Sequence, residues 1–334
     1  MAYVVQELRD RVVLISPNKQ TTYGTGLAIG NLLRRLRFDK AGNFANISRE
    51  YFSDVELAGK GHYFPTVRAL TAKDVQMQLA GEVDDFLAGW VPVFGMMAVS
   101  TAGTNPYTHT IIFEQTTRTA PVTTVYLQDA SVVKSRYLDM VMESFRISGS
   151  QRGPLQYQCS LRGSGSITEG SLTPPALPTL PTPVYLMGND TDILVGVPAS
   201  AASIKERVRS WEVEVVSGVE QHRGPGGGTV ASFAKIGVQR ARVRLRIAAK
   251  DSDDLRTLMV NDTLQELQIN TNSGAAAQLN FKFHNLYFKM TPVADGNEQC
   301  WDLVSEDQDM MKGAGLEPLT VTAINAQATF LVGA

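Results

Sequence analysis

The sequence predicts a mainly β chain (α+β) of two tandem modules, each a β-sandwich or barrel-like sheet with one helix across it. The first observation is an internal repeat, in which Val75-Gln76-Met77-Gln78-Leu79-Ala80 returns as Val243-Arg244-Leu245-Arg246-Ile247-Ala248. Each copy alternates apolar and polar residues, which predicts a strand with one buried face. The second is the acidic pair after each copy, Asp84-Asp85 and Asp253-Asp254, which opens a stretch of helical apolar spacing.

Length and composition agree with this organisation. A chain of 334 residues exceeds the usual size of a single core, which favours two domains. The formal net charge is −2 and 43% of the residues are apolar, so the basic excess of a general phosphate binder is absent. The sequence has no run of 18 apolar residues, and we expect no membrane insertion. Cys159 and Cys300 lie in apolar surroundings and are expected to be buried, reduced thiols.

The first module is predicted to cover residues 1–165. Its strands are expected, between turn residues, at 3–16, 36–38, 75–79, 107–115, 122–128, 138–148 and 155–162. Residues 41–71 are rich in Gly, Asn and charge and are predicted to be a long loop. Pro92 is expected to kink the helix or to end it near Gly95. The apolar positions of this helix are Val83, Phe86, Leu87, Trp90, Val91 and Phe94.

Residues 166–183 are rich in Pro and Gly, have no apolar periodicity and are predicted to be a semi-stiff linker. The second module then covers residues 184–334, with a Gly-rich loop at 221–237. Its helix carries Leu255, Leu258 and Met259. Its strands are expected at 211–215, 243–247, 264–270, 279–290 and 319–330.

No arrangement of residues in the sequence predicts catalysis, a metal site or a cofactor. Adjacent carboxylates on a helix point about 100° apart, so we interpret Asp84-Asp85 and Asp253-Asp254 as complements of the helix dipole. The segment 224–228 lacks the Gly-Lys-Ser/Thr ending of a phosphate-binding loop. The four histidines are too scattered for metal-ligand spacing: His62, His109, His222 and His284.

Several short stretches, spread over nearly the whole chain, occur in an order that resembles a known family. They are Gln6 to Arg11, Asp54 to Gly61, Trp90 after the first helix, and Tyr137 to Gly149 followed by Leu155 to Gly165. This arrangement resembles the major tail tube proteins of long-tailed bacteriophages (siphophages). Within that family, the chain resembles the branch with a duplicated module, in which three subunits supply six modules to a pseudo-hexameric ring.

The resemblance implies a structural virion protein whose modules contribute strands to an inter-subunit β-barrel. Rings stack into a hollow tube in the phage tail, which is assembled in the host cytoplasm and conducts DNA to the host cell at genome ejection. The partners would be further copies of the chain, other tail proteins and DNA that passes non-specifically. Six modules with four strands each, about 4.8 Å apart, give a wall of roughly 115 Å circumference, or about 37 Å across, which admits duplex DNA. The bore is expected to carry mainly acidic and neutral side chains, which repel phosphate.

The resemblance also implies that the long loop contacts the neighbouring ring. That role falls to residues 41–71 in the first module and to 221–237 in the second. From the residues alone, a long loop with spaced aromatics could be disordered in isolation and ordered on assembly. The candidate contact residues are Phe44, Tyr51, Phe52, Glu56, His62 and Phe64.

Four arginines project from one face of the second repeat strand, about 6.6 to 6.8 Å apart. They are Arg240, Arg242, Arg244 and Arg246. One interpretation is a DNA-binding stripe; the other is pairing with Glu212, Glu214 or acidic residues of a neighbouring module. Pairing is favoured, because opposite charges on adjacent strands support correct register and fixed cations would retard moving DNA.

Two alternative functions remain open. The chain could be another ring-forming component of a tail or secretion tube, which images of negatively stained particles would distinguish from long tubes of one protein. It could also be a carbohydrate-binding β-sandwich protein, which would be monomeric with an exposed aromatic cluster.

Overall fold

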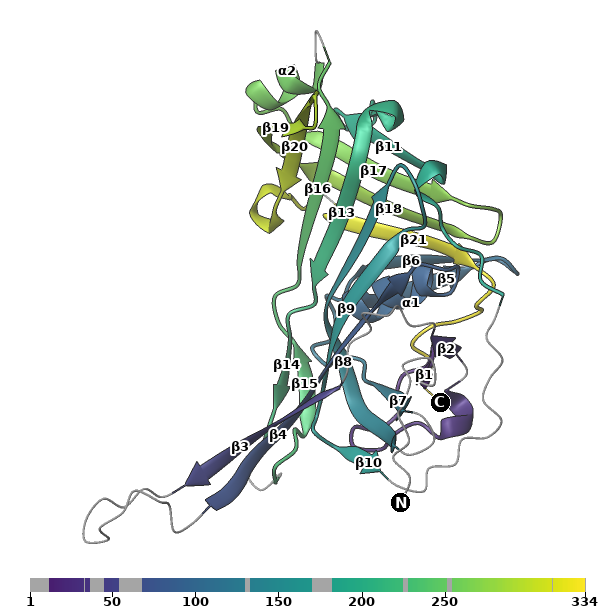
Figure 1. The fold of residues 1–334 in the computed structure, drawn as a ribbon, viewed down its shortest axis with the longest axis vertical. Helices are drawn as coiled ribbons and strands as arrows, with labels where there is room; N and C mark the ends of the chain where they lie inside the picture. Colours follow the sequence, from purple (N-terminus) through teal and green to yellow (C-terminus); the bar gives the residue numbers. More distant parts are fainter. Residues whose placement is uncertain are drawn as a thin grey trace, which may run out of the picture.

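The computed structural model describes residues 12–32, 34–36, 45–53, 68–129, 133–169, 182–224, 228–250, 254–313 and 315–333 (Figure 1). Antiparallel sheets dominate, and the described residues include one α-helix in each half of the chain, α1 (Leu87–Met96) and α2 (Asp254–Val260). We use "first half" for the elements up to β10 and "second half" for those from β11. The predicted mainly β fold with one helix in each half is confirmed.

The strands of the first half are β1 (Val12–Ile15), β2 (Arg34–Leu36), β3 (Asn46–Ser53), β4 (Arg68–Glu82), β5 (Met97–Ala102), β6 (Tyr107–Phe113), β7 (Thr123–Asp129), β8 (Val133–Ser150), β9 (Gln156–Gly163) and β10 (Ile167–Glu169). Those of the second half are β11 (Thr191–Gly196), β12 (Ala202–Ser203), β13 (Val208–Val216), β14 (Val219–His222), β15 (Phe233–Ile236), β16 (Arg240–Ala248), β17 (Gln265–Asn272), β18 (Gln278–Leu286), β19 (Lys289–Asp295), β20 (Glu298–Ser305) and β21 (Leu319–Asn325). Short 3-10 helices are η2 (Ile29–Asn31), η3 (Gly188–Asp190), η4 (Lys205–Arg207) and η5 (Asp307–Asp309).

One continuous antiparallel sheet, which we call the long sheet, crosses both halves of the chain. Its strand order is β3-β4-β9-β8 in the first half and β13-β16-β20-β19 in the second. The two sets are joined by β8 and β13, where residues 144–150 lie opposite residues 210–216. Strand β8 also changes partners along its length, from β7 and β10 to β9 and β13.

This change of partners occurs between Met140 and Val141, next to Asp139, whose φ of 54° is in the left-handed region that few non-glycine residues adopt. Its buried carboxylate accepts hydrogen bonds from Gln20 Nε2 at 2.8 Å, the Gly24 N–H at 2.7 Å and the Ser164 hydroxyl at 2.7 Å. These donors offset the cost of removing a carboxylate from water. They hold the bend that lets one strand serve two sets of neighbours.

A seven-stranded sheet, β12-β11-β17-β18-β21-β6-β5, faces the apolar side of the long sheet. It also combines both halves, because β21 pairs with β6. Helix α1 contacts β8 of the long sheet and β5, β6 and β21 of the other sheet (Figure 1). The main hydrophobic cluster contains residues from both halves, and the rings of Trp211 and Phe281 connect the two sheets at a centroid distance of 6.2 Å.

Helix α1 is buried on all sides instead of presenting a polar face. The acidic pair precedes the helix, so its predicted place in the first turn is wrong. Asp84 nevertheless caps the helix, since its Oδ1 accepts the Leu87 N–H at 2.8 Å while Oδ2 pairs with Arg34 of β2. Pro92 lies inside the helix, and Met97, with a φ of 76°, turns the chain directly into β5.

The predicted long loop at 41–71 is wrong for residues 46–53 and 68–71, which are strands. They pair as a β3–β4 hairpin that projects from the body of the molecule (Figure 1). The loop prediction failed because backbone pairing, and not an apolar pattern, defines this hairpin: Arg49, Glu50, Tyr51, Leu70 and Thr71 are all exposed.

The predicted loop at 221–237 likewise contains parts of a hairpin, β14–β15. This hairpin packs on the first half of the chain, where the Lys73 N–H donates to the Thr229 carbonyl oxygen at 2.8 Å. Within the expected linker 166–183, the first residues form β10 against β8, and residues 170–181 lie outside the described residues. Strands β5, β11 and β20 have no counterpart among the predicted strands.

Candidate functional site

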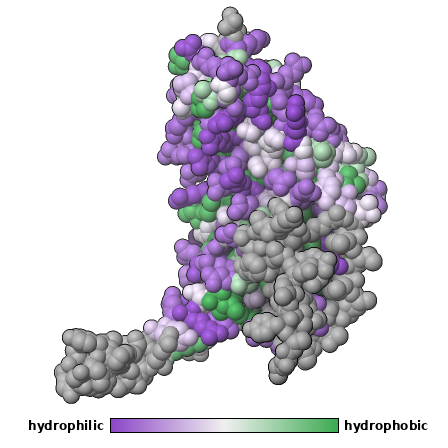
Figure 2. All heavy atoms as spheres, viewed as in Figure 1, coloured by the Kyte–Doolittle hydropathy of each residue, from purple (hydrophilic) through white to green (hydrophobic). Residues whose placement is uncertain are grey.

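The long sheet has one buried face and one polar face. Alternate residues along β4, β9, β8, β13 and β16 are buried, and the residues between them face away from the core. The surface over β13 and β16 is mainly hydrophilic (Figure 2). We call the second set the polar face; it includes Gln76, Gln78, Arg146, Ser148, Gln156, Gln158, Ser160, Glu212, Glu214, Arg240, Arg242, Arg244, Arg246, Thr291, Val293 and Asp302.

In the second half, each arginine of β16 lies beside an acid from β20 or the residues that follow it. Arg240 Nε is 3.4 Å from Asp307 Oδ2, and Arg242 Nη2 is 3.8 Å from Glu306 Oε1. Both pairs are well exposed, so each contributes at most about 1 kcal/mol to stability.

The inner two arginines share one carboxylate, that of Asp302. The Asp302 side chain is 7% exposed, whereas those of Arg244 and Arg246 are 48% and 32% exposed. Arg246 donates to it from Nε at 2.8 Å and from Nη2 at 3.1 Å, and Arg244 donates from Nη2. These charged hydrogen bonds, chiefly those from Arg246, hold the pKa of Asp302 below its usual range. The result is an ionised carboxylate covered by two guanidinium groups.

The two predicted glutamates lie next to the arginines, but the ion pair at Glu212 is formed with another residue. The register places Glu212 opposite Arg244 and Glu214 opposite Arg242. Glu212 Oε2 is 3.0 Å from Arg146 Nε on β8, so this pair crosses the joint between the two halves. The acids that do pair with the β16 arginines could not be predicted from the sequence, because the sequence predicts no strand at β20.

The long sheet ends in two strands, β3 and β19, which have no outer partner among the described strands. Asn46 and Ser48 on β3 are exposed, as are Thr291 and Asp295 on β19. An edge strand presents unpaired N–H and C=O groups that can accept another strand. Both ends of the sheet are therefore places where a further chain can be added.

Most of the predicted loop residues lie outside the described residues. Tyr51 is described; it lies on β3 opposite Leu70 of β4, and the two residues are 40% and 38% exposed. For Phe52, on the same strand, only the backbone is described. The remaining candidates, which lie outside, are Phe44, Glu56, His62 and Phe64.

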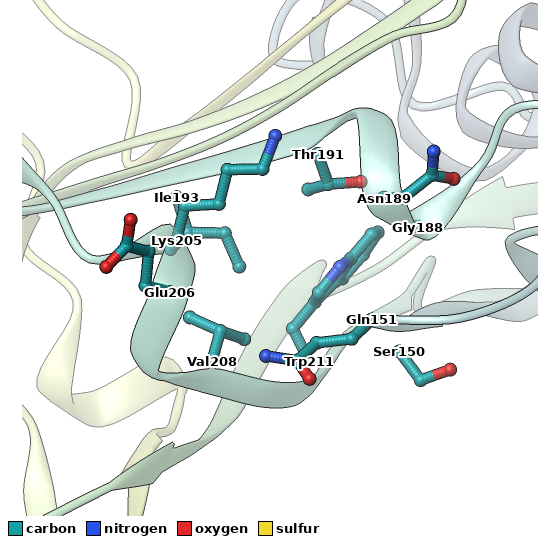
Figure 3. A pocket seen from close by; sticks show the side chains of 10 residues that line it. All are labelled: Ser150, Gln151, Gly188, Asn189, Thr191, Ile193, Lys205, Glu206, Val208 and Trp211. Atoms are coloured by element: carbon teal, nitrogen blue, oxygen red, sulfur yellow. The ribbon is translucent and has the colours of Figure 1, made fainter.

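A cavity of about 320 Å³ lies where η3 and η4 approach the start of β13. Figure 3 shows the Trp211 ring directed toward Gly188, with Lys205 and Glu206 on the other side of the cavity. Trp211 is only 3% exposed, so it does not offer the open aromatic surface that the carbohydrate-binding alternative requires.

In the described part of the chain, the His, Cys, Asp and Glu residues include no group of three or more that could hold a metal ion. No helix there has both the length and the apolar character needed to cross a membrane.

Comparison with known families gives a match over nearly the whole chain. The model of the family described as phage tail tube protein matches residues 10–323. No curated protein matches the sequence. The matched range includes every strand of the long sheet, and therefore the joint between the halves and both open edges.

Proposed function

The chain belongs to the phage tail tube protein family, a family of structural tail components and not of enzymes, and on that premise we propose that three copies close into a ring. Stacked rings form the tube of a siphophage tail, assembled in the host cytoplasm, through which DNA passes at ejection. The chain is then the major tube subunit, and other tail proteins meet the tube at its ends.

The observation that carries this proposal is the repeated strand order of the long sheet. Aligning Gln76 of β4 with Arg244 of β16 matches β3 to β13, β9 to β20 and β8 to β19. The registers of these pairs agree, apart from one extra residue, Glu143, in β8. The two halves are then duplicate modules, 1–165 and 184–334, joined by β8 and β13. The same joint can form between copies, because β19 of one copy is the counterpart of β8 and β3 of the next is the counterpart of β13.

Joints of this head-to-tail kind produce a ring when the rotation at each joint closes. Eight long-sheet strands from each of three copies, at about 4.8 Å spacing, give a wall of roughly 115 Å, the circumference expected for a tube that admits duplex DNA. Closure would also remove both exposed edges. Pro292 on β19 has no N–H, so this edge offers one donor fewer than β8 does, which lowers the risk of pairing with unrelated strands.

The β14–β15 hairpin supports a role for the β3–β4 hairpin at the same joint. It rests on the neighbouring module of its own chain, where Arg223 pairs with Asp74 of β4 at 2.6 Å. We infer that the projecting β3–β4 hairpin packs at the equivalent position on the second module of the next copy. This contact would cover Tyr51 and Leu70. Contact of residues 41–71 with the neighbouring ring stays a prediction.

The polar face is the natural wall of the bore, because the opposite face of the long sheet is buried against α1 and the seven-stranded sheet. The first module would then present mostly amides and hydroxyls to the DNA, while the second presents paired arginines and acids. This changes the expectation of a mainly acidic and neutral lining into one of local neutrality by pairing.

A disulfide across the proposed joint tests the ring directly. Within the chain Ser148 lies opposite Glu212, and the alignment makes Asp295 of one copy and Asn46 of the next their counterparts. We expect the double variant D295C/N46C to give, on oxidation, covalent dimers and trimers on a non-reducing gel, with trimers as the largest product. Each single variant is the control and should not produce the trimer. T291C/E50C tests a second pair of positions at the same joint. A ladder of products longer than the trimer contradicts ring closure by three copies, as does the absence of a cross-link in both double variants.

Mass measurement of the unmodified protein at low and high concentration separates trimer, hexamer and polymer. Negative-stain images should then show long tubes at high concentration. Discrete rings without tubes would favour another ring-forming tail or secretion-tube component, and a monomer at every concentration would refute both assignments.

A further inference from the structure

The two halves carry different charges at equivalent positions of the polar face. In the first half, β4 presents Gln76 and Gln78, which are neutral. In the second half, β16 presents Arg244 and Arg246 at the matching positions of the repeat. Two cations have therefore been placed on one half of a surface that is uncharged at these positions in the other half.

An acid accompanies these cations. Ser160 of β9 lies opposite Gln78, whereas Asp302 of β20 lies opposite Arg246. At this aligned position, the first half has a hydroxyl and the second half has a carboxylate, which lies beneath both arginines and is 7% exposed. The two outer arginines of the stripe have acids of their own in Glu306 and Asp307.

We propose that Asp302, together with Glu306 and Asp307, prevents the arginines of β16 from binding the phosphates of duplex DNA. The inference rests on the proposed function for its biological role, since low affinity for DNA matters on a wall past which DNA must slide. Its physical basis is local: guanidinium N–H groups that donate to a carboxylate have fewer donors left for a phosphate.

Charge balance gives the expected size of the effect. Arg244, Arg246 and Asp302 together carry one net positive charge, and removal of the carboxylate raises this to two. Each cation that neutralises a DNA phosphate steepens the dependence of log affinity on log salt by about 0.9. The carboxylate of Asp295 lies 4.0 Å from Arg246. Because it is exposed, it leaves most of the positive charge added by the loss of Asp302 uncompensated.

The experiment uses the full chain and a short labelled DNA duplex, with binding followed by fluorescence anisotropy between about 50 and 200 mM salt, the range over which counterion release is large. We expect D302N to bind DNA more tightly than the unmodified chain, with a salt slope steeper by about 0.9. S160N is the matched control at the same position of the first half and should leave binding unchanged. The triple variant D302N/R244Q/R246Q, which restores the glutamines of the first half and carries no charge at these three positions, should bind DNA no more tightly than the unmodified chain.

If D302N does not fold, E306Q/D307N gives a second test, because these side chains are 42% and 47% exposed and support little packing. A folded variant of either kind that binds DNA no more tightly than the unmodified chain overturns the proposal, as does a triple variant that binds as tightly as D302N. The binding measurement depends on the polar face of a single chain and does not require that the chain form a tube. Failure to form rings would refute the proposed function and leave this result intact.

Discussion

A single methyl group added at Gly95 should destabilise the protein. Gly95 lies in α1, and a Cβ atom at this position would be 2.2 Å from Cδ1 and 2.4 Å from Cε1 of Phe145 on β8. Phe145 is 1% exposed and belongs to the central core cluster, so its ring is enclosed by other side chains. Such contacts are far inside van der Waals distance, and either the helix or the ring must move.

Two opposing effects decide the magnitude for Gly95→Ala. Alanine gains about 1 kcal/mol over glycine in a helix. Overpacking of an enclosed core costs about 1 to 3 kcal/mol and more where neighbours cannot relax. The steric term is larger here because the clash lies within a rigid contact between a helix and a sheet. We expect a net loss of about 1 to 2 kcal/mol, or a decrease of a few °C in Tm.

Thermal unfolding followed by circular dichroism, at one fixed protein concentration, measures this loss. Gly30→Ala is the control, because a Cβ atom there meets nothing within 4 Å. In G95A/F145L, leucine replaces the ring of Phe145 and removes the clash. The losses of stability from the two substitutions should therefore be strongly non-additive. A G95A variant that melts at or above the temperature of the unmodified protein would refute this account of the helix–sheet contact.

The remaining predictions concern buried titratable groups. His109 donates from Nε2 to Asn325 Oδ1 at 3.1 Å and to the Gln327 carbonyl oxygen at 2.9 Å, and burial lowers its pKa. Because the unfolded chain then takes up the proton first, stability should fall as the pH drops below the ordinary value of 6.5, and urea unfolding of His109→Gln should show a weaker pH dependence. Burial raises the pKa of Cys159 to about 12 and also raises the pKa of Cys300, so neither thiol should react with a maleimide until denaturant is added. Modification of either thiol in the folded protein would contradict the packing around it.

The local elements of the fold could be predicted where the sequence carries a period. The alternation of Val75, Met77 and Leu79 on β4 and of Val243, Leu245 and Ile247 on β16 defines one buried face on each strand, and all six residues are buried. The spacing of Trp90 and its apolar neighbours likewise located α1. Such patterns can be recognised because the polarity of each residue reflects whether its own side chain faces the core.

The candidate site could be predicted only in part. The arginine stripe follows from period-two spacing on a single strand, and the structure places all four arginines on one face. Asp302 could not be assigned to Arg246, because the two are 56 positions apart in sequence and meet only when β16 and β20 pair. The β3–β4 hairpin was missed for a related reason, since its exposed strands carry no apolar period.

By itself, the sequence determined the repeat, the buried faces of the two repeat strands, the helix that follows each and the absence of a general basic excess. The tertiary structure alone decided that β8 bends at Asp139 and pairs with β13, so that the halves share one sheet, and that β3 and β19 are left as its open edges. The physical reason is that the polarity of each side chain indicates whether that residue is buried. Strand pairing, in contrast, is made by backbone groups that are nearly the same in every residue.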